Sequence, residues 1–155
     1  MSEAVTEATD REPLARPIHG KCLCGTVSLT LHRARPMVDM CHCTMCQTWG
    51  GGPFAGLSGA SFDISGEEHV SIYRSSNWAE RAFCSTCGSN LWYRFIPGDH
   101  TSFVAGLFDL PDDIGVLQQI FVDEQPNWYK FIADSPKKTG AEVMAEAKAA
   151  GFTFE

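Results

Sequence analysis

Cysteine placement constrains this chain more than any other feature of its sequence. Three thiols and an imidazole fall within the six-residue window Cys41-His42-Cys43-Thr44-Met45-Cys46. Two shorter motifs flank this window, Cys22-Leu23-Cys24-Gly25 before it and Cys84-Ser85-Thr86-Cys87-Gly88 after it. These three motifs contain all seven cysteines. Any fold of this chain must therefore place its thiols at metal sites, at redox sites or in disulfides.

Metal ligands or redox thiols explain the cysteines better than a disulfide framework does. Seven is an odd number, so disulfides alone would leave one thiol over. Residues 1–7 have neither the basic start nor the apolar stretch of a secretory signal peptide. The sequence also contains no run of roughly 18 apolar residues that could span a bilayer. We therefore expect a cytoplasmic protein, in which clustered thiols stay reduced.

The composition indicates an ordinary globular domain. With 155 residues, the chain is long enough for one domain with a buried core, and 44% of its residues are apolar. Its net charge of −7 argues against binding the phosphate backbone of nucleic acid, which needs a basic surface. Residues 1–16 are polar and acidic. We expect a flexible leader over 1–16 and a single domain over 17–155.

Short alternating segments predict a mainly β fold. Residues 26–31 alternate strictly between polar and apolar, which is typical of a half-buried strand. Further strands are expected at 37–40, 54–57, 70–74, 81–83, 91–95, 101–105 and 119–122. Residues 141–150 have a strongly helical composition, and Gly151 is a natural stop. Many short strands with one late helix predict a mainly β domain with a short C-terminal helix.

The two flanking motifs have the pattern of a structural zinc site. Such a site uses four tetrahedral ligands, usually two close pairs that the fold brings together. The flanking motifs supply two such pairs, each followed by a glycine: Cys22 with Cys24, and Cys84 with Cys87. One zinc ion between them would clamp the N-terminal strand to a later hairpin. The alternative for the second pair is a thioredoxin-like redox motif, which normally opens a helix, whereas strand-forming residues flank this one.

The remaining thiols, Cys41, Cys43 and Cys46, fit a catalytic zinc site. Such a site has three protein ligands and keeps a fourth position for water or substrate. Four ligands from six consecutive residues are hard to arrange as a tetrahedron, so we expect His42 to support the site rather than bind the metal. Two alternatives stay open. One is a closed site completed by a distant acidic residue or by His19, His69 or His100, and the other is a redox site with a Cys43–Cys46 disulfide.

Three motifs, read in order, extend beyond the cysteines themselves. They are Gly20-Lys21-Cys22-Leu23-Cys24-Gly25, the window Cys41–Cys46, and Arg81-Ala82-Phe83-Cys84-Ser85-Thr86-Cys87-Gly88-Ser89-Asn90-Leu91. Together with a closing segment at 120–128, they resemble the glutathione-dependent formaldehyde-activating enzyme family, which includes centromere protein V. The resemblance spans residues 18–135 and implies an Mss4-like fold, with coiled antiparallel β-sheets and zinc-ribbon-type knuckles. The chain departs from the family at Gln119, where many members have a histidine.

The resemblance also implies a ligand assignment and a reaction. It implies two zinc ions per chain, a structural one on Cys22, Cys24, Cys84 and Cys87 and a catalytic one on Cys41, Cys43 and Cys46. The implied enzyme is a carbon–sulfur lyase of the S-(hydroxymethyl)glutathione synthase type, which joins glutathione or a similar thiol to formaldehyde. The expected partners are thus a small thiol and a small aldehyde, with neither nucleic acid nor a membrane.

Two other functions compete with this one. The uncatalysed addition of glutathione to formaldehyde is already quick, so a non-catalytic carrier or scaffold that binds zinc and glutathione is the alternative. A redox enzyme related through its fold to methionine sulfoxide reductases is a third hypothesis, and a zinc content below two ions per chain would favour it. Because glutathione is anionic, the acidic chain must supply local cations to bind it, and the candidates are Lys21, Arg74 and Arg81.

Overall fold

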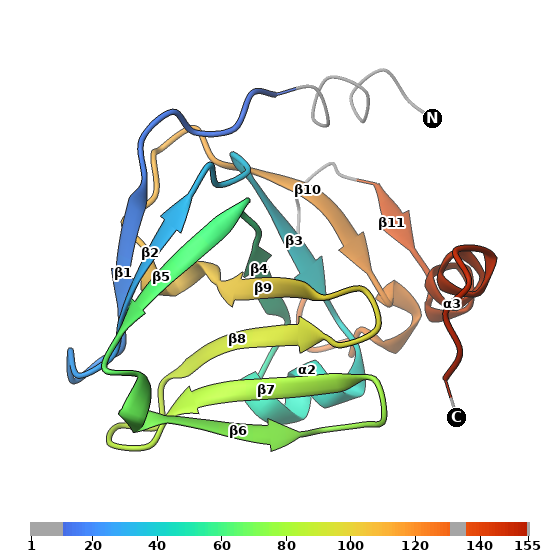
Figure 1. The fold of residues 1–155 in the computed structure, drawn as a ribbon. Coiled ribbons are helices and arrows are strands. Elements are labelled where there is room, and N and C mark those ends of the chain that lie inside the picture. Colours follow the sequence, from blue (N-terminus) through green and yellow to red (C-terminus); the bar gives the residue numbers. More distant parts are fainter. Residues whose placement is uncertain (1–10, 131–135, 155) are drawn as a thin grey trace.

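The computed structural model describes residues 11–130 and 136–154, and in them two β-sheets dominate (Figure 1). The smaller sheet has three strands in the order β1 (Ile18–Lys21), β2 (Ser28–His32) and β5 (Ser61–Ser65). The larger sheet has eight strands in the order β11 (Lys137–Lys138), β10 (Gly115–Ile120), β3 (Met37–Cys41), β4 (Phe54–Leu57), β9 (His100–Val104), β8 (Asn90–Phe95), β7 (Ala79–Cys84) and β6 (Val70–Arg74). The mainly β class predicted from the sequence is confirmed.

Strand pairing is antiparallel through most of both sheets, as expected, and β10 is the exception. It runs parallel to β3 on one side and parallel to β11 on the other. The larger sheet coils strongly, so that β3 and β10 cross the direction of β7 and β8 (Figure 1). Because Ile120 of β10 pairs with Cys41 of β3, this parallel strand brings the C-terminal part of the chain beside the cysteine window.

The helices are short and lie at the ends of strands. The C-terminal helix α3 (Gly140–Ala149) lies where the sequence predicts it, and Thr139 and Glu142 form a capping box at its start. The sequence does not predict the helix α2 (Thr44–Gly50), which directly follows the first two ligand candidates of the window. It ends at Gly51, whose positive φ of 82° ends the helix. Three short 3₁₀ helices complete the list: η1 (Glu67–His69), η2 (Ala105–Leu107) and η3 (Val122–Glu124).

Side chains from both sheets form one hydrophobic core. Leu29 and Leu31 point into it from β2, as the predicted alternation requires, and Phe103 and Leu91 enter from the larger sheet. Each such side chain contributes about 1.5–3 kcal/mol when it is removed from water. The thiol-bearing residue Cys84 belongs to the same core. The turn that begins at Cys84 is therefore anchored to the hydrophobic core.

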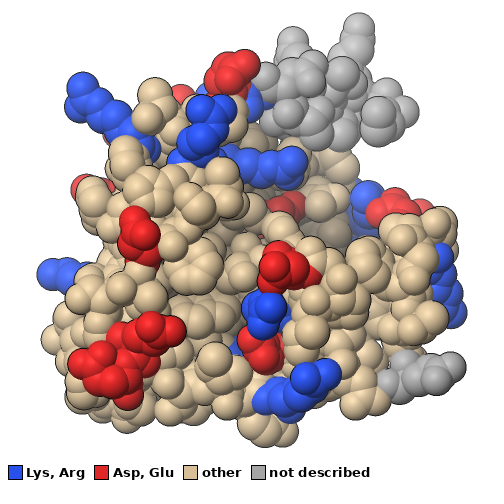
Figure 2. Space-filling model, viewed as in Figure 1, with Lys and Arg blue, Asp and Glu red and all other residues tan. Residues whose placement is uncertain are grey.

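The N-terminal described residues lie along this body. The guanidinium of Arg11 pairs with the carboxylate of Asp113 at 3.2 Å, and the amide of Leu14 donates to the carbonyl of Ala34 at 2.9 Å. The first ten residues of the expected leader lie outside the described residues, so the boundary between 16 and 17 stays a prediction. On the face drawn in Figure 2, acidic and basic side chains are interspersed. Arg94 forms ion pairs with both Glu80 and Asp99. In the described part of the chain, no helix has the length and apolar character needed to cross a membrane.

Candidate metal centres

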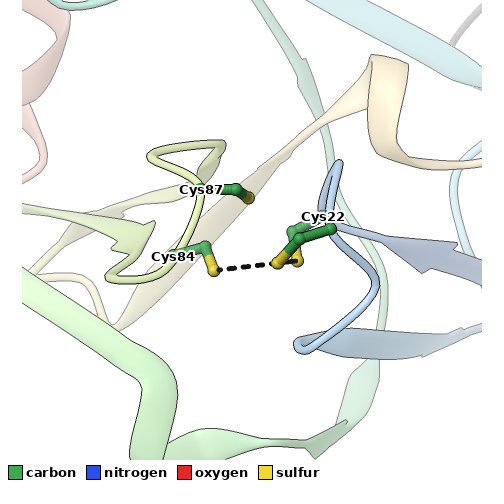
Figure 3. Close-up of side chains that lie close together, drawn as sticks. Cys22, Cys84 and Cys87 are labelled. Carbon is green, nitrogen blue, oxygen red and sulfur yellow. Dashed lines mark hydrogen bonds between the residues drawn. The ribbon is translucent and has the colours of Figure 1, made fainter.

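Four cysteines from distant parts of the chain converge in what we call the four-cysteine cluster: Cys22, Cys24, Cys84 and Cys87. Their sulfur atoms all lie within 4.8 Å of one another. Figure 3 shows Cys22, from the turn after β1, facing Cys84 and Cys87 of the turn between β7 and β8. The sulfurs of Cys22 and Cys24 are 3.5 Å apart, and those of Cys24 and Cys84 are 3.9 Å apart. A tetrahedral zinc ion with bonds of about 2.3 Å places its sulfurs about 3.8 Å apart, so the cluster has the size of a zinc site.

The glycine after each pair explains how the backbone turns around this cluster. Gly25 and Gly88 have φ values of 79° and 75°, in the left-handed region that favours glycine. Their amides donate to the carbonyls of Cys22 and Cys84, at 3.0 and 2.8 Å. Both pairs thus lie in tight turns that a glycine closes, across three residues at Cys22 and across four at Cys84. The turn that the sequence predicts at Gly25 is present.

Ser89 ties the two turns together, and sequence reasoning does not single it out. Its hydroxyl oxygen accepts from the amide of Leu23 at 2.9 Å and lies 3.2 Å from the sulfur of Cys87. Hydrogen bonds from Ser89 lower the pKa of the Cys87 thiol to about 5. Contacts of this kind orient metal ligands and favour their ionised form. A polar residue directly after the second turn is the only sequence signal for this role.

The other three thiols form what we call the three-cysteine cluster: Cys41, Cys43 and Cys46. Cys41 ends β3, Cys43 caps the N-terminus of α2, and Cys46 lies buried in the first turn of that helix. Their sulfurs also lie within 4.8 Å of one another, and the amide of Cys46 donates to the sulfur of Cys43 at 3.4 Å. In the part of the chain that the structure describes, no histidine or carboxylate joins this group. The strand-to-helix transition therefore presents three thiols together.

His42 lies in the interior, where its ring has other partners. Its Nε2 is 3.0 Å from Oε1 of Gln119, and its Nδ1 is 3.1 Å from the hydroxyl of Tyr129. An amide oxygen can only accept, so Nε2 donates to Gln119, while Nδ1 forms a hydrogen bond with the hydroxyl of Tyr129. Gln119 is thus a buried partner of His42. Tyr129 has no signal in the sequence that links it to the window.

Arg81 places a buried positive charge beside the three-cysteine cluster. Its side chain is 3% exposed, and both terminal nitrogens lie 3.7 Å from the sulfur of Cys46. The rings of Trp49 and Tyr93 flank the guanidinium at 4.9 and 5.2 Å. Among the described residues, no carboxylate lies within 4.0 Å of it. A buried guanidinium needs polar or negative partners, and the group that both of its terminal nitrogens contact is the sulfur of Cys46.

The other two candidate cations lie elsewhere. Lys21 lies on β1 beside a separate surface hollow, and Arg74 of β6 donates to the backbone carbonyls of Ser76 and Asn77. Of the three cations that the sequence singles out, Arg81 alone lines the space around the three-cysteine cluster.

A cavity of about 130 Å³ opens beside the three sulfurs, and we call it the small cavity. Its floor is one face of the larger sheet. Asp39 and Cys41 are two residues apart on β3, so their side chains share that face, and their partners on β4 are Gly56 and Phe54. The same lining continues across the sheet through paired residues on β9, β8 and β7: Ser102, Tyr93 and Arg81. Residues of α2 complete the walls: Met45 and Cys46.

A larger open groove of about 500 Å³ adjoins the small cavity. Met45 and Arg81 line both spaces, while Trp49 and Tyr73 are among the residues that line the groove only. The two spaces therefore meet at α2. The small one is narrow and contains the sulfurs, and the larger one is wide and open to solvent.

The ionisable groups of the small cavity influence one another. Hydrogen bonding with Cys43 raises the pKa of Cys41, and the same contact lowers the pKa of Cys43, with a smaller contribution from the charge of Arg81. Burial raises the pKa of Tyr93 and that of Asp39. The pKa of Cys46 is raised as well, mainly through its contacts with the neighbouring thiols, so Cys43 is the thiol of this cluster whose pKa is lowered. Asp39 could have been found from the sequence by its two-residue spacing from Cys41, whereas nothing local marks Tyr93.

Comparison with known proteins identifies a family and similar sequences. The model of the glutathione-dependent formaldehyde-activating enzyme family matches residues 17–124. A protein of Schizosaccharomyces pombe named an uncharacterized lyase is 34% identical over 127 residues, which cover 81% of this chain and 93% of the relative. A protein of Halomonas elongata, provisionally named a glutathione-dependent formaldehyde-activating enzyme, is 38% identical over 85 residues, 48% of this chain and 54% of the relative.

Among solved structures, the crystal structure of a Rhodobacter sphaeroides protein matches 59% of this chain and 87% of its own, with 19% identity and a TM-score of 0.48. The family match includes all seven cysteines and both clusters. The resemblance that the motifs carry is confirmed by that match and by the relative from Schizosaccharomyces pombe. The chain therefore belongs to the glutathione-dependent formaldehyde-activating enzyme family.

Proposed function

We propose that this protein is a zinc-dependent carbon–sulfur lyase that joins glutathione, or a similar thiol, to formaldehyde. One observation carries the proposal. Three sulfurs lie within 4.8 Å of one another on the wall of a small cavity, and no other described metal-ligating side chain completes the group. Three ligands with a free position are typical of catalytic zinc. The relatives named as a lyase and as a formaldehyde-activating enzyme support the reaction class.

The donor atoms at both clusters suit zinc. Thiolates are soft ligands that zinc binds well, and two sulfur separations in the four-cysteine cluster match a tetrahedral ion. Cys41, Cys43 and Cys46 would hold a second zinc ion, so the protein would bind two per chain. A zinc ion held there would accept the sulfur of the substrate thiol and keep it deprotonated near neutral pH.

The two adjoining spaces would hold different parts of the substrates. The groove has a volume of about 500 Å³, and the small cavity has about a quarter of that volume, about 130 Å³. This is enough for formaldehyde and the sulfur end of a thiol, but not for a tripeptide. The body of the thiol would lie in the open groove, which is about 500 Å³. Phe54, Tyr93 and Ile120 give the small cavity apolar walls that exclude water from the reacting atoms.

The reaction needs no oxidant or reductant. A carbon–sulfur bond forms between the thiol sulfur and the carbonyl carbon, and the carbonyl π electrons move to oxygen. The oxygen takes up one proton, which balances the proton that the thiol loses. In the reverse direction the same bond breaks and formaldehyde leaves. The protein's part is to hold the sulfur, orient the aldehyde and exclude solvent.

Exchange spectroscopy tests the proposal directly. We expect the protein to accelerate the interconversion of glutathione, formaldehyde and their adduct, as seen by nuclear magnetic resonance in mixtures with and without it. With acetaldehyde the acceleration should be at least about tenfold smaller, because one additional carbon crowds a cavity of about 130 Å³. Equal acceleration for both aldehydes would contradict the size argument. Glutathione binding without any acceleration would leave the carrier function in place of the enzyme.

Arg81 gives a second prediction, on metal affinity. We expect Arg81→Met to weaken zinc binding at the three-cysteine cluster by about 10–100-fold, because it removes the cation beside Cys46 and retains a long side chain between the aromatic rings. Competition with a chelator measures this affinity, and the zinc of the four-cysteine cluster should stay bound. Arg74→Met, on β6, is the matched control. Unchanged affinity in Arg81→Met would show that the guanidinium does not act on the site.

A further inference from the structure

Asp39 holds an oxygen that its own protein leaves without a partner. Among the described residues, its Oδ1 is the buried side-chain oxygen or nitrogen for which no hydrogen bond is found. The carboxyl group does interact with the side chain of Gln118, its neighbour on β10. Leaving a buried polar atom unpaired costs free energy, so such an atom in a folded protein calls for an explanation. A bound substrate group would provide one.

The position of Asp39 indicates which substrate group would be its partner. It lies two residues before Cys41 on β3, so both side chains project from the same face of the strand. Opposite it on β4 is Gly56, which has no side chain to fill the space, and both residues line the small cavity. A Cβ atom at Gly56 would come within 2.8 Å of the Phe54 ring. The carboxyl group and the three sulfurs therefore border one small volume.

Two other polar side chains of this cavity, those of Arg81 and Ser102, already have partners. Both terminal nitrogens of Arg81 contact the sulfur of Cys46, and the hydroxyl of Ser102 lies 3.2 Å from the ring nitrogen of His100. In the adduct of a thiol with formaldehyde, a single carbon separates the sulfur from a hydroxyl group. A ligand whose sulfur lies at the three-cysteine cluster thus carries its hydroxyl into the cavity that Asp39 borders.

We propose that Asp39 binds the aldehyde-derived hydroxyl of the adduct, which donates its hydrogen to Oδ1. This inference rests on the proposed function and makes it more specific, because it names the residue that distinguishes a hydroxymethyl thioether from other thioethers. Asp39 is then a binding residue for the product of addition and, in the reverse direction, for the substrate of cleavage. The hydrogen bond would supply the partner that the folded protein lacks.

The test compares two ligands that differ in one hydroxyl group. S-hydroxymethylglutathione, maintained by excess formaldehyde, and S-methylglutathione are titrated into the zinc-loaded protein and followed by nuclear magnetic resonance. We expect the wild-type protein to bind the hydroxymethyl ligand about tenfold more tightly than the methyl ligand. Asp39→Leu, which keeps the branching but has no polar atom, should lose this preference, and Asp39→Asn should recover part of it. Asp63→Leu, on the exposed strand β5, is the matched control.

Stability distinguishes this role from a structural one. Asp39→Leu removes an unpaired buried oxygen but also the carboxyl partner of Gln118, so its thermal midpoint should stay close to that of the wild type. A lower midpoint together with weaker binding of both ligands would show a structural role and overturn the inference. Equal affinity of the wild-type protein for the two ligands would overturn the inference before any variant is measured. If the wild type accelerates exchange and Asp39→Leu has the same ligand preference as the wild type, only the assignment of Asp39 fails. If the wild type does not accelerate exchange, the proposed function itself is refuted.

Discussion

Replacing Cys84 by serine is expected to unfold the domain. Cys84 is fully buried, and its cluster joins the turn after β1 to the hairpin of β7 and β8. In zinc-finger peptides, structural zinc contributes about 10–16 kcal/mol at pH 7, which matches the whole stability of about 5–15 kcal/mol of a typical domain. A serine hydroxyl does not replace a thiolate ligand. Circular dichroism should show the loss of a cooperative thermal transition, and metal analysis should show the loss of zinc.

Thr86→Ala is the control for this variant. Thr86 is exposed in the same turn as Cys84, and its substitution should leave both the thermal midpoint and the zinc content unchanged. If Cys84→Ser instead unfolds at the wild-type midpoint with its full zinc content, the four-cysteine cluster is not the structural site. Removal of zinc from the wild type by a strong chelator should reproduce the effect of Cys84→Ser, since both remove the same clamp.

Replacing Cys43 by serine should have the opposite outcome, with activity lost and the fold retained. Cys43 caps the N-terminus of α2, where its sulfur accepts from the amide of Cys46. Serine is itself a favoured residue at this position, so the helix should still form. With one of three thiolates gone, the three-cysteine cluster should release its zinc. We expect one zinc ion per chain, a thermal midpoint close to the wild type, and exchange at the uncatalysed rate.

The two cysteine variants serve as controls for each other. Each changes one sulfur to oxygen, but in a different cluster, so the same chemical change should unfold one protein and only inactivate the other. Full zinc content and full acceleration in Cys43→Ser would show that the three-cysteine cluster is not the reaction site. Loss of the fold in Cys43→Ser would make this cluster a second structural site, which is the closed-site alternative that the spacing leaves open.

The four-cysteine cluster is the part of the molecule that the sequence predicts best. Its pairs have short spacing, and Gly25 and Gly88 mark turns that only a few residues control. Local geometry of this kind is visible in a sequence because the interacting atoms are near neighbours in the chain. The contacts between the two pairs are not local, since Cys24 and Cys84 are 60 residues apart and the bond from the amide of Leu23 to Ser89 crosses 66 residues.

Elements that depend on distant contacts were harder to predict. The helix α2 has seven residues and ends in glycine, so its composition does not distinguish it from a turn. The strand β10 begins at Gly115, whereas the sequence predicts a strand over 119–122. The prediction misses the start of the strand because the pairing partner β3 lies more than 70 residues earlier in the chain. A strand's boundaries depend on such partners as much as on its own residues.

Residue spacing alone indicated which thiols form close pairs and where the knuckle turns lie, because those interactions depend on a few adjacent dihedral angles. Folding alone brought Arg81 to Cys46, Tyr129 and Gln119 to His42, and Asp39 to the wall of the cavity that holds the sulfurs. These contacts depend on how strands far apart in the chain align and on how strongly the sheet coils. Hydrophobic burial of the whole domain determines that alignment, and no short stretch of sequence encodes it.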